Sequence, residues 1–299
     1  MLGDLVTSLV HRLLGTPTPR STPRSTGLTP ARGSHTLATI MSDSNRAACG
    51  TIGIVLIGDE LLSGSVKDLN SDYIIRSFSA VGYSVGEIRI IPDDRERIAE
   101  ALRELAPRFE YVLSSGGIGP THDDVTLEAA AAAFGVDLID DPTMAAFLEN
   151  HYGERMNDAL RRMARVPAGA DVGLNDGQVT WPLIRFRNLF ILPGLPRALR
   201  DKVDRIIAKL EPIGEFATGE VFLTAYESDY VDWLNSFIER HADVSVGSYP
   251  YWENPEYRTR ITVRSRDSQA VRRAIDELVS YVDAKGWLVR STTDGFRSA

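Results

Sequence analysis

The feature that most constrains the fold is a glycine-rich stretch, Ser114–Thr126, which reads SSGGIGPTHDDVT. An apolar run, Tyr111–Leu113, precedes it and predicts the end of a buried strand, whereas the alanine-rich run Leu127–Phe134 predicts a helix. A strand, a glycine loop and a helix in this order present backbone N–H groups and a positive helix end to an anion. Because Asp123 and Asp124 would repel a bare phosphate, the stretch predicts a phosphate site bridged by a cation.

A purely structural interpretation of this loop is also available. Glycine serves tight turns, and Thr121 as N-cap with Asp124 three residues later would form a box-like cap. That interpretation accounts for one aspartate but not for the remaining loop residues, which are Ser114, Ser115, Gly116, Gly117, Gly119, His122 and Asp123. We therefore expect a ligand site. His122 fits a general base, a metal ligand or a hydrogen-bonding loop residue. A Walker A ending and the Rossmann glycine spacing are both absent.

Apolar runs that alternate with amphipathic segments predict a mainly parallel sheet. Strands are expected at Thr51–Gly58 and Val85–Ile91, and helices after Asn70 or Ser71 and after Pro92–Asp94. Ligands of such sheets bind outside the carboxyl ends of the strands. The acidic residues that fall at those ends, together with the glycine loop, are Asp59, Glu60, Asp93 and Asp94. Each of these acids alone also suits a cap or a turn, but their shared placement favours a hard divalent cation such as Mg²⁺.

Further along the chain, Asp141-Pro142 predicts a helix start, and a basic helix is expected over Arg155–Arg165. Thr180–Phe186 and Leu189–Leu192 predict a hairpin. The hairpin is followed by Pro193-Gly194-Leu195-Pro196 and by a helix over Arg197–Leu210. This second loop-to-helix junction would add backbone donors to the anion site.

Residues 215–292 follow a different pattern, β-α-β-β-α-β, which predicts a separate small split α+β domain. The proposed division is a tail at 1–48, an α/β domain at 49–214, the small domain, and a tail at 293–299. The aromatic residues of the small domain would either stack on an adenine or flavin ring or pack its hairpin; they are Tyr249, Tyr251, Trp252 and Tyr257.

The first forty residues are rich in Ser, Thr, Pro and Arg, and Asp4 is the only acid before Met41. This composition cannot bury enough apolar surface to fold alone. The amphipathic, acid-poor start resembles an organelle transit peptide, but we favour a tail without a targeting role or translation from Met41. We expect a cytoplasmic protein, or an organellar one if the start is a transit peptide.

Composition excludes several classes of function. A net charge of −8 disfavours nonspecific binding to nucleic acid or to anionic membranes, and no apolar run is long enough to cross a bilayer. The single cysteine, Cys49, excludes an intrachain disulfide and a multi-cysteine metal site. No Gly-x-Ser-x-Gly elbow is present, so covalent hydrolase chemistry is not expected.

Four motifs together resemble the molybdopterin-binding domain family, namely Ile57–Gly64, Pro92–Asp94, Ser114–Thr126 and Pro193–Pro196. Within it, the chain is similar to the amino-terminal part of competence/damage-inducible protein A and to the related domain fused to eukaryotic FAD synthases. The resemblance covers residues 51 to 290. It implies a three-layer α/β/α domain with a mainly parallel sheet.

The resemblance also implies roles for matching residues. Phosphate or nucleotide binding would fall to the glycine loop and its neighbours, namely Gly58, Ser114, Ser115, Gly116, Gly117, Gly119, Thr121, Pro193 and Gly194. Catalysis would involve Asp93, Asp94 and Asp124, and the metal ligands would be Asp59, Glu60, Asp123 and Asp124.

Related proteins imply a nucleotide diphosphatase that acts on ADP-ribose or FAD with Mg, Mn or Co. The alternatives are adenylylation of molybdopterin and a noncatalytic pterin- or nucleotide-binding module. The resemblance further implies a homo-oligomer. It does not supply the identity of the ligand or the preferred metal.

Overall fold

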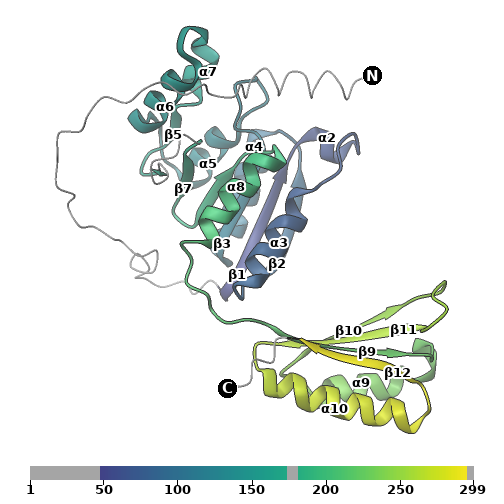
Figure 1. Ribbon diagram of the computed structural model, residues 1–299. Coiled ribbons are helices and arrows are strands. Elements are labelled where there is room, and N and C mark those ends of the chain that lie inside the picture. Colours follow the sequence, from purple (N-terminus) through teal and green to yellow (C-terminus); the bar gives the residue numbers. More distant parts are fainter. Residues whose placement is uncertain (1–47, 174–180, 295–299) are drawn as a thin grey trace, which may run out of the picture. The chain divides into compact units, whose positions relative to one another are not determined.

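The computed structural model describes residues 48–173 and 181–294 (Figure 1). Most of the predicted tail at 1–48, with its targeting alternatives, lies outside the described residues, and so does most of the tail at 293–299. No helix in the described ranges is both long and apolar enough to cross a membrane.

A six-stranded sheet forms the larger domain, in the order β2-β1-β3-β8-β7-β6. Four neighbouring strands, β2, β1, β3 and β8, are parallel, whereas β7 and β6 add an antiparallel edge. The strands are β1 (Ala48–Ile57), β2 (Ser84–Ile91), β3 (Phe109–Ser115), β6 (Asp171–Gly173), β7 (Leu183–Phe186) and β8 (Leu189–Leu192). The prediction of a mainly parallel sheet is confirmed.

Helices cover both faces of this sheet, which makes three layers (Figure 1). Helices α3 and α8 lie together on one face, and α4 and α5 lie together on the other. The helices of this domain are α2 (Asp59–Leu62), α3 (Asn70–Ala80), α4 (Arg95–Leu105), α5 (Thr126–Phe134), α6 (Pro142–Tyr152), α7 (Asp158–Arg162) and α8 (Pro196–Ile207). A short ladder pairs β4 (Leu138–Asp140) with β5 (Arg165–Pro167).

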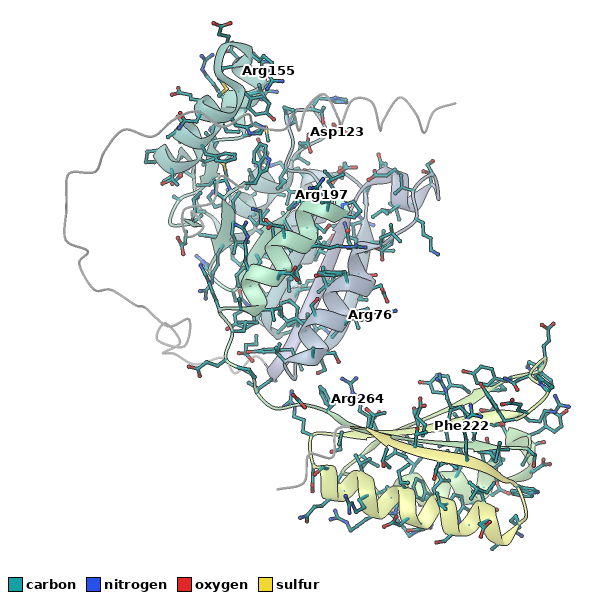
Figure 2. All side chains as sticks on the ribbon, in the orientation of Figure 1. Arg76, Asp123, Arg155, Arg197, Phe222 and Arg264 are labelled. Carbon is teal, nitrogen blue, oxygen red and sulfur yellow. The ribbon has the colours of Figure 1, made fainter. Side chains whose placement is uncertain are left out.

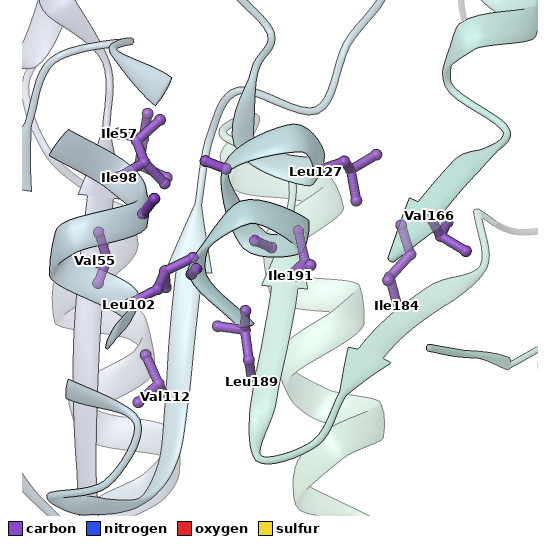
Figure 3. Close-up of a cluster of buried hydrophobic side chains, with 14 of the residues drawn as sticks. Val55, Ile57, Ile98, Leu102, Val112, Leu127, Val166, Ile184, Leu189 and Ile191 are labelled. Atoms are coloured by element: carbon purple, nitrogen blue, oxygen red, sulfur yellow. The ribbon is translucent and has the colours of Figure 1, made fainter. Parts of the chain in front are cut away.

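Strand β1 is buried on both faces, as its unbroken apolar run predicts. Val55 and Ile57 pack with Ile98 and Leu102 of α4 in one buried cluster (Figure 3). Ile54 alternates with them along the strand and is fully buried. Burial on both faces fixes the register, since a slip by one residue would exchange the two faces. The ends of the strands are therefore held at fixed positions.

Two helix starts follow their predicted chemistry. The Asp141 carboxylate accepts a hydrogen bond from Met144 N at 2.8 Å, with Pro142 in the first turn of α6. The Asp94 carboxylate caps α4 by accepting from Arg97 N at 2.9 Å. A capping role therefore accounts for the position of Asp94.

Three local predictions are wrong. The basic helix expected over Arg155–Arg165 is interrupted, because Asn157 caps a new short helix, α7, and the chain then enters β5. Helix α5 begins at Thr126, so Thr121 is not its N-cap. Neither Asn70 nor Ser71 caps α3; the carboxylate of Asp68 accepts from both of their backbone N–H groups instead.

The small domain has the predicted β-α-β-β-α-β order and forms a four-stranded antiparallel sheet, β10-β11-β9-β12. Helices α9 and α10 lie on one face of it (Figure 1) and share a buried apolar cluster with Val221, Ile261 and Val263. The elements are β9 (Ala217–Leu223), a 3₁₀ turn η3 (Glu227–Asp229), α9 (Val231–Arg240), β10 (Ser245–Pro250), β11 (Thr259–Ser265), α10 (Ser268–Ala284) and β12 (Leu288–Asp294).

Candidate functional site

The carboxyl ends of the four parallel strands meet at one edge of the larger sheet. Ile57 pairs with Ile91, Leu56 with Ser115, and Ser115 with Leu192, so four strands end side by side. The segments that leave this edge are Gly58–Glu60, Pro92–Asp94, Gly116–Asp124 and Pro193–Leu195. Figure 2 shows Asp123 at this end of the domain. The sheet therefore brings together the four motifs that were separate in the sequence.

Two glycines of the loop have backbone conformations that other residues rarely adopt. Gly116 has φ 114°, and a Cβ there would overlap the carbonyl oxygen of Ile57. Gly117 has φ 66°, and a Cβ would overlap the hydroxyl of Thr126. The loop is also anchored, because Gly116 N donates to Leu192 O at 3.1 Å and Thr126 Oγ1 donates to Gly116 O at 2.9 Å. The glycines hold the loop close against the strand ends.

The anchored loop leaves several donors unused. Within the part of the chain that the structure describes, the N–H groups of Gly117, Ile118 and Gly119 donate to no protein acceptor. They precede helix α5, whose first-turn N–H groups add positive partial charge. Consecutive donors of this kind form a concave anion site. The geometry suits phosphate oxygens.

Asp93 lies at this edge and has a raised pKa. Its Oδ2 accepts a hydrogen bond from Asp59 N at 2.9 Å. Burial raises the pKa of Asp93 above its ordinary value, and the carboxylates of Glu60, Asp59 and Asp123 raise it further. The carboxylates of three strand ends are therefore close enough to affect the pKa of Asp93.

The neighbouring acid, Asp124, is engaged within the loop. Its Oδ2 accepts from Thr121 N at 2.8 Å and also from the Thr121 hydroxyl. The Thr121 hydroxyl, which has one proton to share between the two carboxylates, and the backbone N–H of Asp123 lower the pKa of Asp123 and favour its ionised form. His122 is almost fully exposed, and its ring lies 3.9 Å from the Asp123 carboxylate. The structure thus gives Asp124 a loop-stabilising contact, and its role in catalysis or metal binding stays a prediction.

The acids at this edge suit a hard cation that is shared with a phosphate. Among the described residues, no three His, Cys, Asp or Glu side chains are grouped so as to hold a metal ion by themselves. Mg²⁺ commonly takes only one or two protein carboxylates and completes its shell with water and substrate phosphates. Burial and the neighbouring carboxylates together raise the pKa of Asp93, and a cation at this edge would offset both effects.

The sequence analysis placed Ser114 and Ser115 with the phosphate-binding loop, but in the structure both lie in the buried end of β3. Both are buried in the interior, and Ser114 Oγ has no hydrogen-bond partner among the described residues. Ser115 Oγ accepts from the Asn70 side chain at 3.0 Å and donates to Pro193 O at 3.3 Å. Their hydroxyls lie beneath the loop, and Asn70 is a site residue that the sequence analysis treated only as a possible cap.

Two arginines near the loop were also missed. Arg162 of α7 lines a small pocket together with Gly119, Thr121 and Asp124. Arg197 is exposed in the first turn of α8, directly after the Pro193–Pro196 motif (Figure 2). Arg162 lies in a segment whose basic character is visible in the sequence. Its position beside the loop could not be predicted, because the expected helix is interrupted and α7 starts anew at Asp158. Guanidinium groups at these positions would pair with phosphate.

Comparison with known proteins identifies the class. Residues 53–212 match the family described as "Probable molybdopterin binding domain", and residues 215–290 match "FAD synthase, middle domain". The chain therefore belongs to the molybdopterin-binding domain family, as its motifs predicted. The second match coincides with the small antiparallel domain.

The individual relatives share about a third of the aligned residues with this chain. A protein from Archaeoglobus fulgidus is 31% identical over 232 residues, which cover 78% of this chain and 98% of that protein. A "Probable FAD synthase" from Caenorhabditis elegans is 28% identical over 272 residues, covering 80% of this chain and 52% of that protein. A "CinA-like protein" from Myxococcus xanthus is 37% identical over 156 residues, covering 50% and 37%. The chain thus spans about half of the FAD synthase and less of the CinA-like protein.

Among solved structures, the protein CinA from Thermoplasma acidophilum, described as of unknown function, is 27% identical. It has a TM-score of 0.49 and covers 52% of this chain and 95% of its own. MoaB from Thermus thermophilus, described as a molybdopterin biosynthesis enzyme, is 20% identical with a TM-score of 0.36, covering 54% and 91%.

Proposed function

We propose that this protein hydrolyses the diphosphate bond of a nucleotide such as ADP-ribose or FAD. The observation that carries the proposal is the row of N–H groups at Gly117, Ile118 and Gly119, which donate to no acceptor among the described residues. They leave the same sheet edge as Asp93, whose pKa is raised. A diphosphate in the loop would accept those N–H groups through its nonbridging oxygens. Membership of the molybdopterin-binding domain family and the likeness to a probable FAD synthase support a small-molecule ligand of this kind.

Each group at the edge has a role in this reaction. Asp93, as the more basic carboxylate, would take a proton from the attacking water, while Asp123 stays ionised. The water oxygen bonds to phosphorus, the bridging P–O bond breaks, and the departing phosphate oxygen keeps the electron pair. ADP-ribose would thus give AMP and ribose 5-phosphate, and FAD would give AMP and FMN. Arg162 and Arg197 would balance the phosphate charge.

The residues that would hold a divalent ion are Asp59, Glu60 and Asp123, with the remaining positions taken by water and phosphate. When bound, the ion would polarise a phosphoryl oxygen and lower the cost of charge on it. Mg, Mn and Co are the candidates.

The same cradle would also serve transfer of an adenylyl group, and the family description and the FAD synthase relatives favour that reaction as the second candidate. The two reactions differ in the acceptor, which is water or the phosphate of a pterin or flavin. A noncatalytic binding module would retain the ligand without turnover.

The test is an assay of the full chain with ADP-ribose and FAD, with Mg, Mn or Co or with chelator, and with AMP measured by chromatography. Metal-dependent release of AMP supports the proposal. Adenylylated pterin or FAD formed from ATP, in place of hydrolysis, would establish the transferase, and calorimetric binding without either product would establish a binding module. Shift of the unfolding temperature by metal alone provides a readout that is independent of turnover.

A matched pair of cap variants tests the predicted catalytic role of Asp94. Asp94 and Asp141 both cap a helix through one backbone N–H, at 2.9 Å and 2.8 Å, and asparagine caps nearly as well. If Asp94 acts only as a cap, Asp94→Asn and Asp141→Asn will both keep kcat within about twofold of the wild type. A loss of tenfold or more in Asp94→Asn alone would assign chemistry to Asp94.

A further inference from the structure

Asn70 lies beneath the candidate site and joins segments that are far apart in sequence. It is the first residue of α3, yet it is 9% exposed and its side chain makes no hydrogen bond to the backbone of that helix. Its Nδ2 donates to Ser115 Oγ at 3.0 Å and to Gly194 O at 2.7 Å. These partners lie at the ends of β3 and β8. One amide therefore connects the glycine loop to the Pro193–Gly194 loop.

The direction of these hydrogen bonds is fixed. The carbonyl of Gly194 can only accept, so the NH₂ end of the amide must face it. The Ser115 hydroxyl donates to Pro193 O at 3.3 Å and must therefore accept from Asn70. The chain of donors runs from Asn70 through Ser115 to Pro193. Among the described residues, Asn70 Oδ1 is buried without a partner, which costs free energy that a merely structural position would avoid.

The two joined loops are in backbone contact. Gly116 N donates to Leu192 O at 3.1 Å, and a Cβ on Gly194 would lie 3.4 Å from Gly116 Cα. The N–H groups of Gly117, Ile118 and Gly119 follow immediately. A change in the separation of the two loops therefore moves the donors that would hold phosphate.

We propose that Asn70 is a positioning residue, which sets the separation of the glycine loop from the Pro193–Gly194 loop through Ser115 and Gly194. The kinetic consequence rests on the proposed function, whereas the ordering of the loop does not. Aspartate cannot replace it, because a carboxylate oxygen would then face Gly194 O across a distance of 2.7 Å without a proton. Alanine would leave the buried Ser115 Oγ and the partly buried Gly194 O without their donor.

The chain contains a matched control in Asn188, at the turn between β7 and β8. Asn188 Nδ2 also donates to two backbone carbonyls, Ala106 O at 2.9 Å and Phe109 O at 3.0 Å. These carbonyls lie at the amino end of β3, away from the glycine loop. Asn188→Ala therefore removes the same number of amide hydrogen bonds without touching the candidate site.

The first experiment measures amide hydrogen exchange of the full chain, without ligand, by mass spectrometry. Asn70→Ala should speed exchange about tenfold or more in peptides covering 114–121 and 192–196, while Asn188→Ala leaves these peptides at the wild-type rate. Unchanged exchange in Asn70→Ala would overturn the proposal. If Asn70→Ala does not fold, Ser115→Ala, which removes one arm, should show the same change to a smaller extent, and unchanged exchange there would overturn it.

The second experiment measures kcat and KM for ADP-ribose. A displaced cradle should lower kcat/KM about 10–100-fold in Asn70→Ala and at least as much in Asn70→Asp. Asn188→Ala should keep the wild-type kcat/KM even if its unfolding temperature falls as much as that of Asn70→Ala. Equal losses of kcat/KM in the two alanine variants would reduce Asn70 to a structural residue. A wild type without turnover would contradict the proposed function, and the exchange experiment would still decide the role of Asn70.

Discussion

Charged side chains gather at the carboxyl edge of the larger sheet and on the helix-free face of the smaller sheet. At the edge, carboxylates lie close to one another, whereas on the smaller sheet Arg260 and Arg290 are each paired with a carboxylate. At the edge, Asp93 lies among the carboxylates of Asp59, Glu60 and Asp123, and N–H groups of the glycine loop remain unused. The groups at this edge repel one another or lack a partner.

On the small domain, one row of side chains crosses all four strands, in the order Tyr249, Arg260, Phe222 and Arg290. Arg260 lies 5.1 Å from the Tyr249 ring and 3.4 Å from Glu220, while Arg290 lies 4.1 Å from the Phe222 ring and 3.2 Å from Glu256. Each of these two cations has both a ring and a carboxylate, although Arg260 Nε has no hydrogen-bond partner among the described residues. This difference is expected if the edge binds a ligand, as we propose, and if the row serves stability.

Asp93→Asn should have the largest effect, and it should act in opposite directions on activity and stability. An amide still accepts the hydrogen bond from Asp59 N but cannot take a proton from water, so kcat should fall about 10²–10⁴-fold. Removal of one charge from the acidic group should raise the unfolding temperature at pH 7 by about 1–3 °C. Loss of both activity and stability would show that Asp93 is a structural residue and would end the contrast between the two regions.

The stability that Asp93→Asn gains should depend on pH, because the pKa of Asp93 is raised in the folded protein. Because the pKa of Asp93 is raised on folding, its contribution to stability is present below the ordinary aspartate value of 3.8 and is lost as pH rises through the folded pKa. The asparagine variant therefore gains most at neutral pH and nothing below pH 3.8. Thermal unfolding of both proteins at pH 7 and below pH 3.8 measures this difference. A gain that is equal at both pH values would contradict the assignment.

The sequence predicted what depends on short-range patterns. The apolar run of β1, the Asp141-Pro142 cap and the glycine loop each appear within a few residues, and all formed as expected. Asn70 could not be assigned in this way, because its partners Ser115 and Gly194 lie 45 and 124 residues away. The residues around Asn70 are also typical of a helix cap. Its contacts become visible only in the folded sheet, which brings the ends of β3 and β8 together.

Gly116→Ala should have the next largest effect, on stability. The residue combines φ 114° with a Cβ that would overlap a strand carbonyl, so the variant should lose about 2–4 kcal/mol of unfolding free energy. Gly135→Ala is the control, since Gly135 has φ 65° but nothing within 4 Å of its Cβ, and it should cost about 1 kcal/mol. Chemical denaturation measures both. Equal losses would mean that close packing of the loop contributes little.

Two substitutions on the small domain should have the smallest effects. Arg290→Ala removes one ring contact and one exposed ion pair, which together stabilise by about 1 kcal/mol, and it should leave kcat/KM unchanged. Trp252 is 76% exposed and contacts the Tyr226 ring at 5.8 Å, so Trp252→Ala should change stability by less than about 0.5 kcal/mol. Denaturation and steady-state kinetics of both variants test these values. A severalfold rise in KM for FAD in Trp252→Ala would instead mean that this aromatic group stacks on the ligand ring, and the two regions would then share one substrate.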